Sequence, residues 1–251
     1  MESGGGIDER GSLGLPHNFE QRLALLKRRL VRESAQAIGM LEAALAALWT
    51  LDVDAARTVR NEDDKVDTEE VNIEREAHSL LALHHAFARD FRAITFILKV
   101  NADIERVADH ASSIAKITVR IAKHLGDGEK LATQPPQWPT ALRELGDRVP
   151  LMCHELMRAV LDENVDAARE LMKGDQTIDT LDRRLFEEVL DLIEEAPDRR
   201  MLAAGMLIYR IGRELERVGD LMTNISEDVV YLATGSIVRH TEKKRLRSTG
   251  S

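Results

Sequence analysis

The chain has 251 residues, 43% of them hydrophobic and 31% charged, and a formal net charge of −9. This length allows one large or two small domains, and the composition is typical of a soluble protein rich in helix. The acidic balance argues against general nucleic-acid binding and leaves room for metal cations or basic partners. No apolar run approaches the ~18 residues of a membrane span. The polar start does not resemble a signal peptide, and a single cysteine, Cys153, fits a reducing compartment, so we expect a cytoplasmic protein.

Residues 1–17 are rich in glycine and are predicted to form a flexible N-terminus. From Phe19 the apolar residues recur at steps of three or four, which predicts an amphipathic helix that ends before Asp52. Asp54 is expected to cap a second helix, which runs to about His84. A third helix is predicted over 90–124, closed by Gly126. These three helices predict a first bundle over 18–126.

The segment 127–139 contains three prolines, which cannot continue a helix, and is predicted to link two domains. The same pattern then recurs as helices over 140–161, 166–194 and 197–234, with Pro150 expected to kink the first. They predict a second bundle over 140–236, ended at Gly235, and a flexible basic tail over 237–251. The fold class is therefore all-α, with two tandem three-helix antiparallel bundles related by internal duplication.

Acidic pairs spaced four residues apart reveal the duplication. Asp63 and Asp67 recur 112 residues later as Asp175 and Asp179. A second acidic pair follows in each half, Glu105 with Asp109 and then, 111 residues later, Glu216 with Asp220. One residue is therefore lost in the second copy between the two acidic pairs.

Side chains four residues apart lie on one face of a helix, so each half carries two acidic stripes. Like charges at this spacing repel, and a multivalent cation between two facing stripes would reverse the sign of that interaction. Oxygen ligands suit hard cations such as magnesium, calcium, manganese or iron. The candidate metal ligands are Asp63, Asp67, Glu70, Glu105 and Asp109 in the first half, and Asp175, Asp179, Asp182, Glu216, Asp220, Asn224 and Glu227 in the second.

A solvated acidic face that pairs with nearby arginines is the plain alternative for any single stripe. Its duplication at matched register favours a cation site instead. Histidine ligation is disfavoured, because no histidine has an acidic residue three positions before it, as ferritin-type sites require. Cys153 is expected to be a core thiol, and Trp49 and Trp138 are expected to be packing residues.

At these residues the sequence resembles the PhoU family, whose members regulate the phosphate-specific transport system. The stretch 98–111, which contains Glu105 and Asp109, is similar to the family's first signature. The stretch 214–235, which contains Glu216 and Asp220, is similar to its second. The resemblance covers roughly residues 18–237.

The resemblance implies a non-enzymatic regulator of phosphate uptake and phosphate-starvation signalling. It implies a metal cluster on each bundle, of iron or zinc and possibly multinuclear, with magnesium or manganese not excluded. The expected partners are the ATPase subunit of the phosphate ABC transporter, a sensor histidine kinase and a second copy in a homodimer, with membrane association only through these partners. A metal-dependent hydrolase or oxidase, and a metal-free helical adaptor, are the alternative interpretations.

The two copies differ where the second has Asn224 and Glu227, because the first has Ser113 and Lys116. The sequence therefore predicts that the second site holds metal better than the first.

Overall fold

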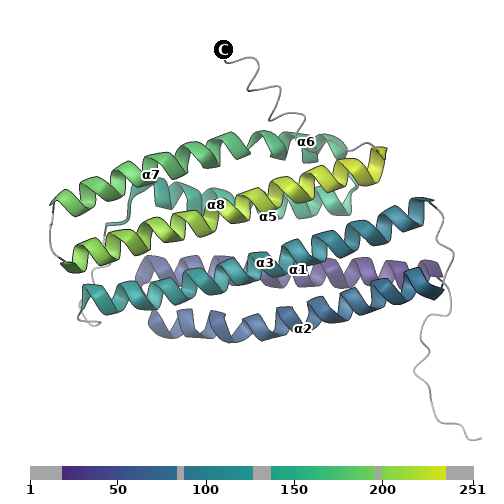
Figure 1. Cartoon of the computed structure of the whole chain (residues 1–251), viewed down its shortest axis with the longest axis horizontal. Helices are drawn as coiled ribbons and strands as arrows, with labels where there is room; N and C mark the ends of the chain where they lie inside the picture. Colours follow the sequence, from purple (N-terminus) through teal and green to yellow (C-terminus); the bar gives the residue numbers. More distant parts are fainter. Residues whose placement is uncertain (1–18, 84–87, 127–136, 196–198, 236–251) are drawn as a thin grey trace, which may run out of the picture.

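The computed structural model describes residues 19–83, 88–126, 137–195 and 199–235. Within these residues it contains seven α-helices and no strand, which confirms the all-α class and the tandem bundles (Figure 1). The first repeat consists of α1 (Phe19–Thr50), α2 (Val53–Leu83) and α3 (Ala88–Leu125). The second consists of α5 (Thr140–Leu161), α6 (Val165–Lys173), α7 (Asp175–Glu195) and α8 (Arg199–Thr234).

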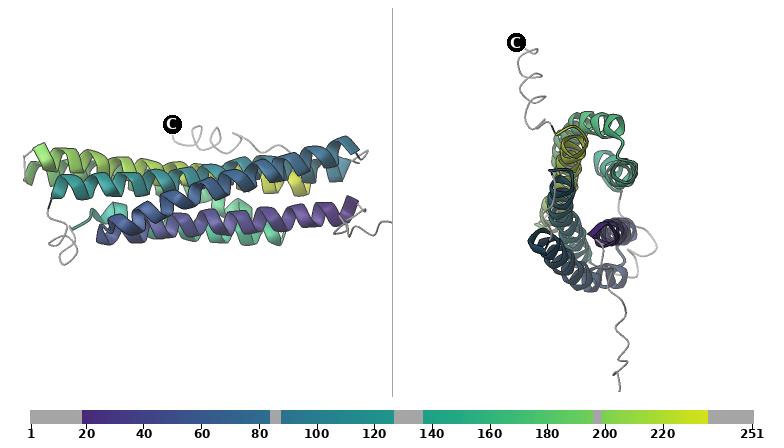
Figure 2. Two further views of the ribbon diagram at one scale, coloured as in Figure 1. Left: turned by 90° about the horizontal axis from the view of Figure 1, so that it is seen from below. Right: turned by 90° about the vertical axis from the view of Figure 1, so that its right-hand side faces the viewer.

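The helices form two layers. In the front layer α2, α3, α8 and α7 lie side by side, and α1 and α5 lie behind it (Figures 1 and 2). The third helices of the two repeats, α3 and α8, are neighbours at the centre, so the bundles share a long interface. Since α1 and α5 cover the back of this layer, the side chains that α3 and α8 leave exposed lie on its open face.

The duplication extends to the turns between the first and second helices. Leu51 and Glu163, 112 residues apart, both have a positive φ, of 53° and 48°. This left-handed conformation is uncommon for residues other than glycine, so each turn ends its helix abruptly. The next residue in each repeat caps the following helix. The Asp52 carboxylate accepts from the backbone N–H groups of Asp54 and Ala55, and Asn164 accepts from that of Ala167. The expected cap at Asp54 was therefore wrong by two residues.

The helix predicted over 166–194 is interrupted, because α6 ends at Lys173 and α7 begins at Asp175. Gly174 stands between them, where the first repeat has Glu62 within an unbroken α2. Glycine costs helix stability, which explains why only the second copy breaks. Pro150 lies inside α5, which continues through it.

Gly126 and Gly235 follow the last residues of α3 and α8 with φ of 77° and 71°, as expected for glycines that end helices. The residue lost from the second copy falls in the connection between the second and third helices, 84–87 in one repeat and 196–198 in the other. These two connections, together with Pro197, lie outside the described residues. No described helix is both long enough and apolar enough to cross a membrane.

The cores of the two repeats join into one apolar cluster. Trp49 and Trp138 meet edge to face at 5.9 Å between ring centroids, and the Arg143 guanidinium lies 4.3 Å from the Trp49 ring centroid. Both tryptophans are therefore packing residues, as expected. Cys153 is also buried in this core, and burial raises the pKa of its thiol to about 12, so it is inert.

Candidate metal centre: two unequal acidic clusters

The first acidic cluster consists of Asp63, Asp67 and Glu70 on α2 and Glu105 and Asp109 on α3. These helices pack antiparallel, and carboxylates of the two stripes lie within electrostatic range of one another where the helices meet. Asp67 and Asp109 are exposed, and the other three are half-buried. The structure thus brings together the five residues that the sequence singled out in this half.

Burial and mutual repulsion raise the pKa of four of these carboxyls. For Asp63, burial is the main cause, the Ser112 hydroxyl opposes it, and the charges of Asp109 and Asp67 add to it. Burial also raises the pKa values of Asp67, Glu70 and Glu105, each helped by neighbouring carboxylates. The cluster therefore concentrates negative charge that little nearby positive charge balances.

One oxygen of the first cluster has no partner. Asp63 Oδ1 is buried and accepts no hydrogen bond from the described residues. A buried acceptor without a donor is costly, and a cation beside it would remove that cost. The donor set is all oxygen, so the residues present fit a hard cation.

The second acidic cluster consists of Asp179 and Asp182 on α7 and Glu216 and Asp220 on α8. Asp179 and Asp220 are exposed, Glu216 is half-buried and Asp182 is buried. Burial raises the pKa of Glu216, the positive charge of Arg213 opposes it, and Asp220, Asp182 and Asp179 add to it. The two stripes of this half therefore also lie within electrostatic range of one another.

An arginine lies within the second cluster. Arg213 Nη1 donates to Asp182 Oδ2 at 3.1 Å, and Arg213 Nη2 lies 3.3 Å from Glu216 Oε2. The first repeat has Ala102 at the register of Arg213. Two of the four carboxylates in the second cluster are therefore already compensated by a side chain, as the alternative of an acidic face that pairs with nearby arginines predicts.

The remaining candidate ligands extend beyond these clusters. The side chain of Asp175 lies outside the described part of the structure. Asn224 is exposed and Glu227 half-buried, one and two turns further along α8 than Asp220. Among the described residues, no three histidine, cysteine or acidic side chains converge closely enough to hold a metal ion as they stand. A cation would therefore require the exposed carboxylates to rotate inward.

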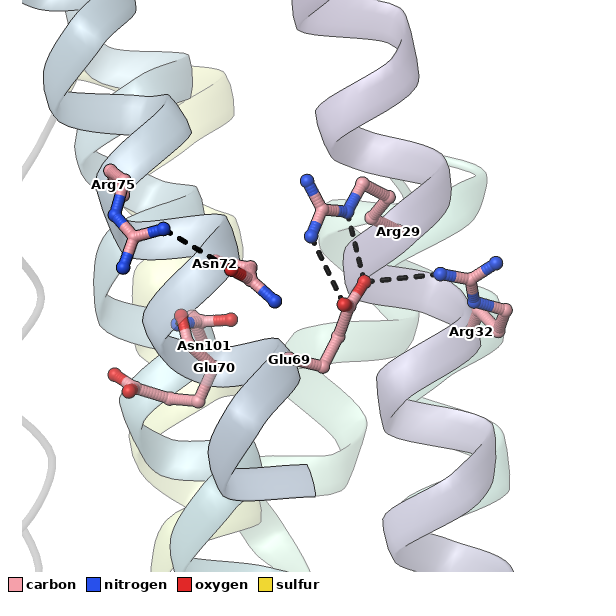
Figure 3. Close-up of polar contacts among 7 residues, drawn as sticks. All are labelled: Arg29, Arg32, Glu69, Glu70, Asn72, Arg75 and Asn101. Carbon is pink, nitrogen blue, oxygen red and sulfur yellow. Dashed lines mark hydrogen bonds and ion pairs between the residues drawn. The ribbon is translucent and has the colours of Figure 1, made fainter. Parts of the chain in front are cut away.

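On the side of α2 that faces α1, the carboxylate of Glu69 is already paired with arginines. Glu69 accepts from Arg29 Nε at 2.9 Å and Nη2 at 3.0 Å and from Arg32 at 3.1 Å, which lowers its pKa. Figure 3 shows Glu69 reaching toward α1, whereas Glu70 turns away from these arginines beside Asn101. Adjacent glutamates thus have different roles. Glu69 links α2 to α1, and Glu70 belongs to the first acidic cluster.

Two polar contacts tie the repeats together at α3 and α8. His110 Nδ1 lies 2.7 Å from Glu214 Oε2, and Lys99 Nζ lies 2.9 Å from Asp228 Oδ1. Both carboxylates are buried. Sequence spacing placed His110 away from the acidic stripe, but it held no signal for a partner more than a hundred residues away.

These features define a duplicated all-α protein with an acidic cluster on each bundle. The family model "PhoU domain" matches residues 30–118 and 142–229, two segments in the register of the internal repeat. The chain belongs to the PhoU family.

Proteins similar to this chain carry names of the same family. The chain is 33% identical over 198 residues to a Deinococcus radiodurans protein, covering 78% of this chain and 87% of that one. It is 30% identical over 221 residues to a Clostridium acetobutylicum protein, covering 88% and 96%. Both relatives are named "Phosphate-specific transport system accessory protein PhoU homolog". The crystal structure of PhoU from Pseudomonas aeruginosa has a TM-score of 0.79 and 28% identity over 87% of this chain and 100% of that one.

Proposed function

We propose that this protein is an accessory protein of a phosphate-specific transport system that restrains phosphate uptake and signals phosphate sufficiency. The observation that carries this proposal is the match of both repeats to the PhoU domain, together with the names of relatives that align over most of the chain. It would act without catalysis, by binding the ATPase subunit of the phosphate ABC transporter and a sensor histidine kinase at the cytoplasmic face of the membrane.

The second bundle offers a surface for the ATPase subunit. Phe186 and Tyr209 stack edge to face at 5.5 Å between ring centroids and line a hollow of about 550 Å³ with charged neighbours. Leu190 and Met206 are exposed on the same two helices, α7 and α8. Exposed apolar side chains gathered on one face favour a protein partner.

The first bundle exposes other apolar side chains, Val71, Leu83 and Phe91, but none at the corresponding positions. The residues of the first repeat at the register of Phe186, Leu190 and Met206 are polar: Glu74, His78 and Thr95. This difference between the repeats supports docking of the ATPase subunit through the second bundle.

A co-purification experiment tests the docking. The tagged full-length chain is expected to retain the ATPase subunit of its own transporter, and Met206→Glu is expected to abolish the retention. The matched control is Thr95→Glu on the first bundle, which should leave it intact. Failure of the parent chain to retain the subunit at either high or low phosphate would contradict the proposal, as would turnover of phosphate esters or dioxygen by the purified protein.

We further propose that the acidic clusters bind metal cations, iron being the first candidate and zinc, manganese or magnesium the others. A bound cation would neutralise the facing carboxylates and cross-link the second and third helices of a bundle. Asp63, Asp67, Glu70, Glu105 and Asp109 would hold it in the first bundle, and Asp179, Asp182, Glu216 and Asp220 in the second. Elemental analysis of the protein purified without chelator, beside the Asp67→Ala/Asp179→Ala double variant, tests this. Absence of bound metal in the parent protein would contradict it.

A further inference from the structure

Beneath the first acidic cluster, the core of the first bundle contains a carboxylate. Glu33 on α1 is only 1% exposed, and neither of its oxygens has a hydrogen-bond partner among the described residues. Buried charges are normally paired or neutralised, because removing them from water is costly. Burial is the main cause that raises the pKa of Glu33 to about 8, with the charges of Glu69 and Glu70 adding to it.

A third buried oxygen in this region, on a second side chain, is also unsatisfied. Asn101 on α3 is 1% exposed, and its Nδ2 donates to the backbone oxygen of Glu70 at 3.0 Å. Its Oδ1 is buried and accepts nothing from the described residues. Two acceptors without donors in one core are unusual, and both need a positively charged or hydrogen-donating partner.

The duplication indicates that Glu33 and Asn101 face each other. Their register equivalents in the second repeat are Leu145 and Gly212. There, a Cβ built on Gly212 would lie 3.9 Å from Leu145 Cδ1, so these two positions are in contact. Both repeats bury the corresponding positions of their first helices, so the same geometry brings Glu33 toward Asn101.

This pair adjoins the first acidic cluster from the covered side. The charges of Glu70 and Glu105 both act on Glu33, and Asn101 is bonded to the backbone of Glu70. Arg29, whose charge acts on Glu33, is held by Glu69 in two hydrogen bonds. The open face supplies exposed carboxylates to the first acidic cluster, and α1 supplies a buried one below them.

We propose that Glu33 and Asn101 extend the first acidic cluster inward and that the Glu33 carboxylate and Asn101 Oδ1, with Glu70 and Glu105, bind a hard divalent cation. Because no three acidic side chains among the described residues converge closely enough as they stand, the cation would draw the half-buried Glu70 and Glu105 side chains inward toward Glu33. This inference rests on the proposed cation binding and assigns to it a third helix, α1. Carboxylate and amide oxygens are the ligands that manganese, magnesium and calcium prefer. The second bundle has Leu145 and Gly212 at these positions and lacks the extension.

The test uses Mn²⁺ alone, with free Mn²⁺ counted by electron paramagnetic resonance during titration of the full-length protein. All samples carry Asp179→Ala/Asp220→Ala, so that the first cluster dominates. Glu33→Gln keeps the size and hydrogen-bonding capacity of the side chain but removes the charge. It is expected to weaken Mn²⁺ binding about tenfold or more, the loss usual for groups that support a metal site. Glu42→Gln, which removes an exposed carboxylate from the same helix, is the matched control and should bind as the parent does.

Glu33→Leu, which has the residue of the second repeat at this position, is a second test if the glutamine variant folds poorly. Circular dichroism checks the fold of both variants. Loss of affinity in these variants, with Glu42→Gln unaffected, supports the inference. Parental affinity in a folded Glu33→Gln or Glu33→Leu variant would overturn it while leaving cation binding by the outer carboxylates standing. A parent that binds no Mn²⁺ would overturn both proposals.

Discussion

The two acidic clusters have the same register, yet they balance their charge differently. In the second cluster Arg213 pairs with Asp182 and Glu216 and supplies a positive charge from within the protein. The first cluster has Ala102 at that register and holds a further buried carboxylate, Glu33, below it. A duplicated site can thus keep its carboxylates while one copy compensates two of them with an arginine and the other has no arginine at that position.

The comparison favours the opposite order of cation affinity from the one that the sequence predicts. Asn224 and Glu227 add oxygen atoms to the second half, which predicts the better metal site there. Arg213 weakens that argument, because a cation entering the second cluster has to displace a guanidinium from two carboxylates or accept its repulsion. We therefore expect the first cluster to bind cations more tightly.

The largest expected effect is the dependence of the protein's stability on pH through the buried carboxylate of Glu33. Because the folded-state pKa of Glu33 is about 8, above its ordinary value of 4.5, the folded protein holds a proton that the unfolded chain releases between these pH values. The stability contribution of Glu33 is therefore full below pH 4.5 and is lost as pH rises through 8. Glu33→Leu should stabilise the metal-free protein at pH 8.5 by about 5 kcal/mol, at about 1.4 kcal/mol per pKa unit, and by less at pH 5.5.

Urea denaturation in the presence of a chelator at the two pH values measures this effect. Ala43→Leu, at an exposed position on the same helix, serves as the control and should leave the pH dependence unchanged. An equal effect of Glu33→Leu at pH 5.5 and 8.5 would contradict a raised pKa for Glu33.

The next effect compares one carboxylate from each cluster. Asp67→Ala should weaken the tighter class of Mn²⁺ sites by about 100-fold, since the loss of a direct ligand should match the upper range known for supporting groups. Asp179→Ala should affect only the weaker class. Equilibrium dialysis of the two variants against the parent separates the tighter from the weaker Mn²⁺ sites. If Asp179→Ala instead weakened the tighter sites, the second cluster would be the better metal site, as the sequence predicts.

A reciprocal exchange at the arginine position should produce a smaller change. Arg213→Ala should tighten cation binding at the second cluster, and Ala102→Arg should weaken it at the first, each by about tenfold. In the presence of a chelator, Arg213→Ala should also lower the melting temperature, since Asp182 and Glu216 lose their partner, and added Mn²⁺ should restore it. Calorimetric titration gives the affinities, and changes of the same sign in both variants would refute the role given to Arg213.

The smallest effect compares the helix caps. Asp52→Ala and Asn164→Ala should each destabilise the protein by about 1 kcal/mol, because each removes the acceptor that satisfies backbone N–H groups at a helix start. Asp54→Ala, at the cap position that the sequence suggested, should change stability by less. Thermal denaturation of the three variants measures the difference, and a larger loss for Asp54→Ala would contradict the assigned caps.

The sequence by itself determined the helices, the duplication and which carboxylates share a face. These properties follow from local periodicity, because a residue's place on a helix depends only on its spacing from its neighbours. The break at Gly174 and the cap at Asp52 were missed. Propensity does not locate a helix end to one residue, and Asp54 offers the same side chain as Asp52 two positions later.

Only the tertiary structure decided how the charges are used. Whether Arg213 points into the cluster, whether His110 meets Glu214 across the repeats, and whether Glu33 is buried without a partner all depend on helices far apart in the chain. Periodicity places such residues on a face but does not say which neighbouring helix covers it. Packing of α3 against α8, and of α1 behind α2 and α3, supplied that information and made two similar clusters unequal.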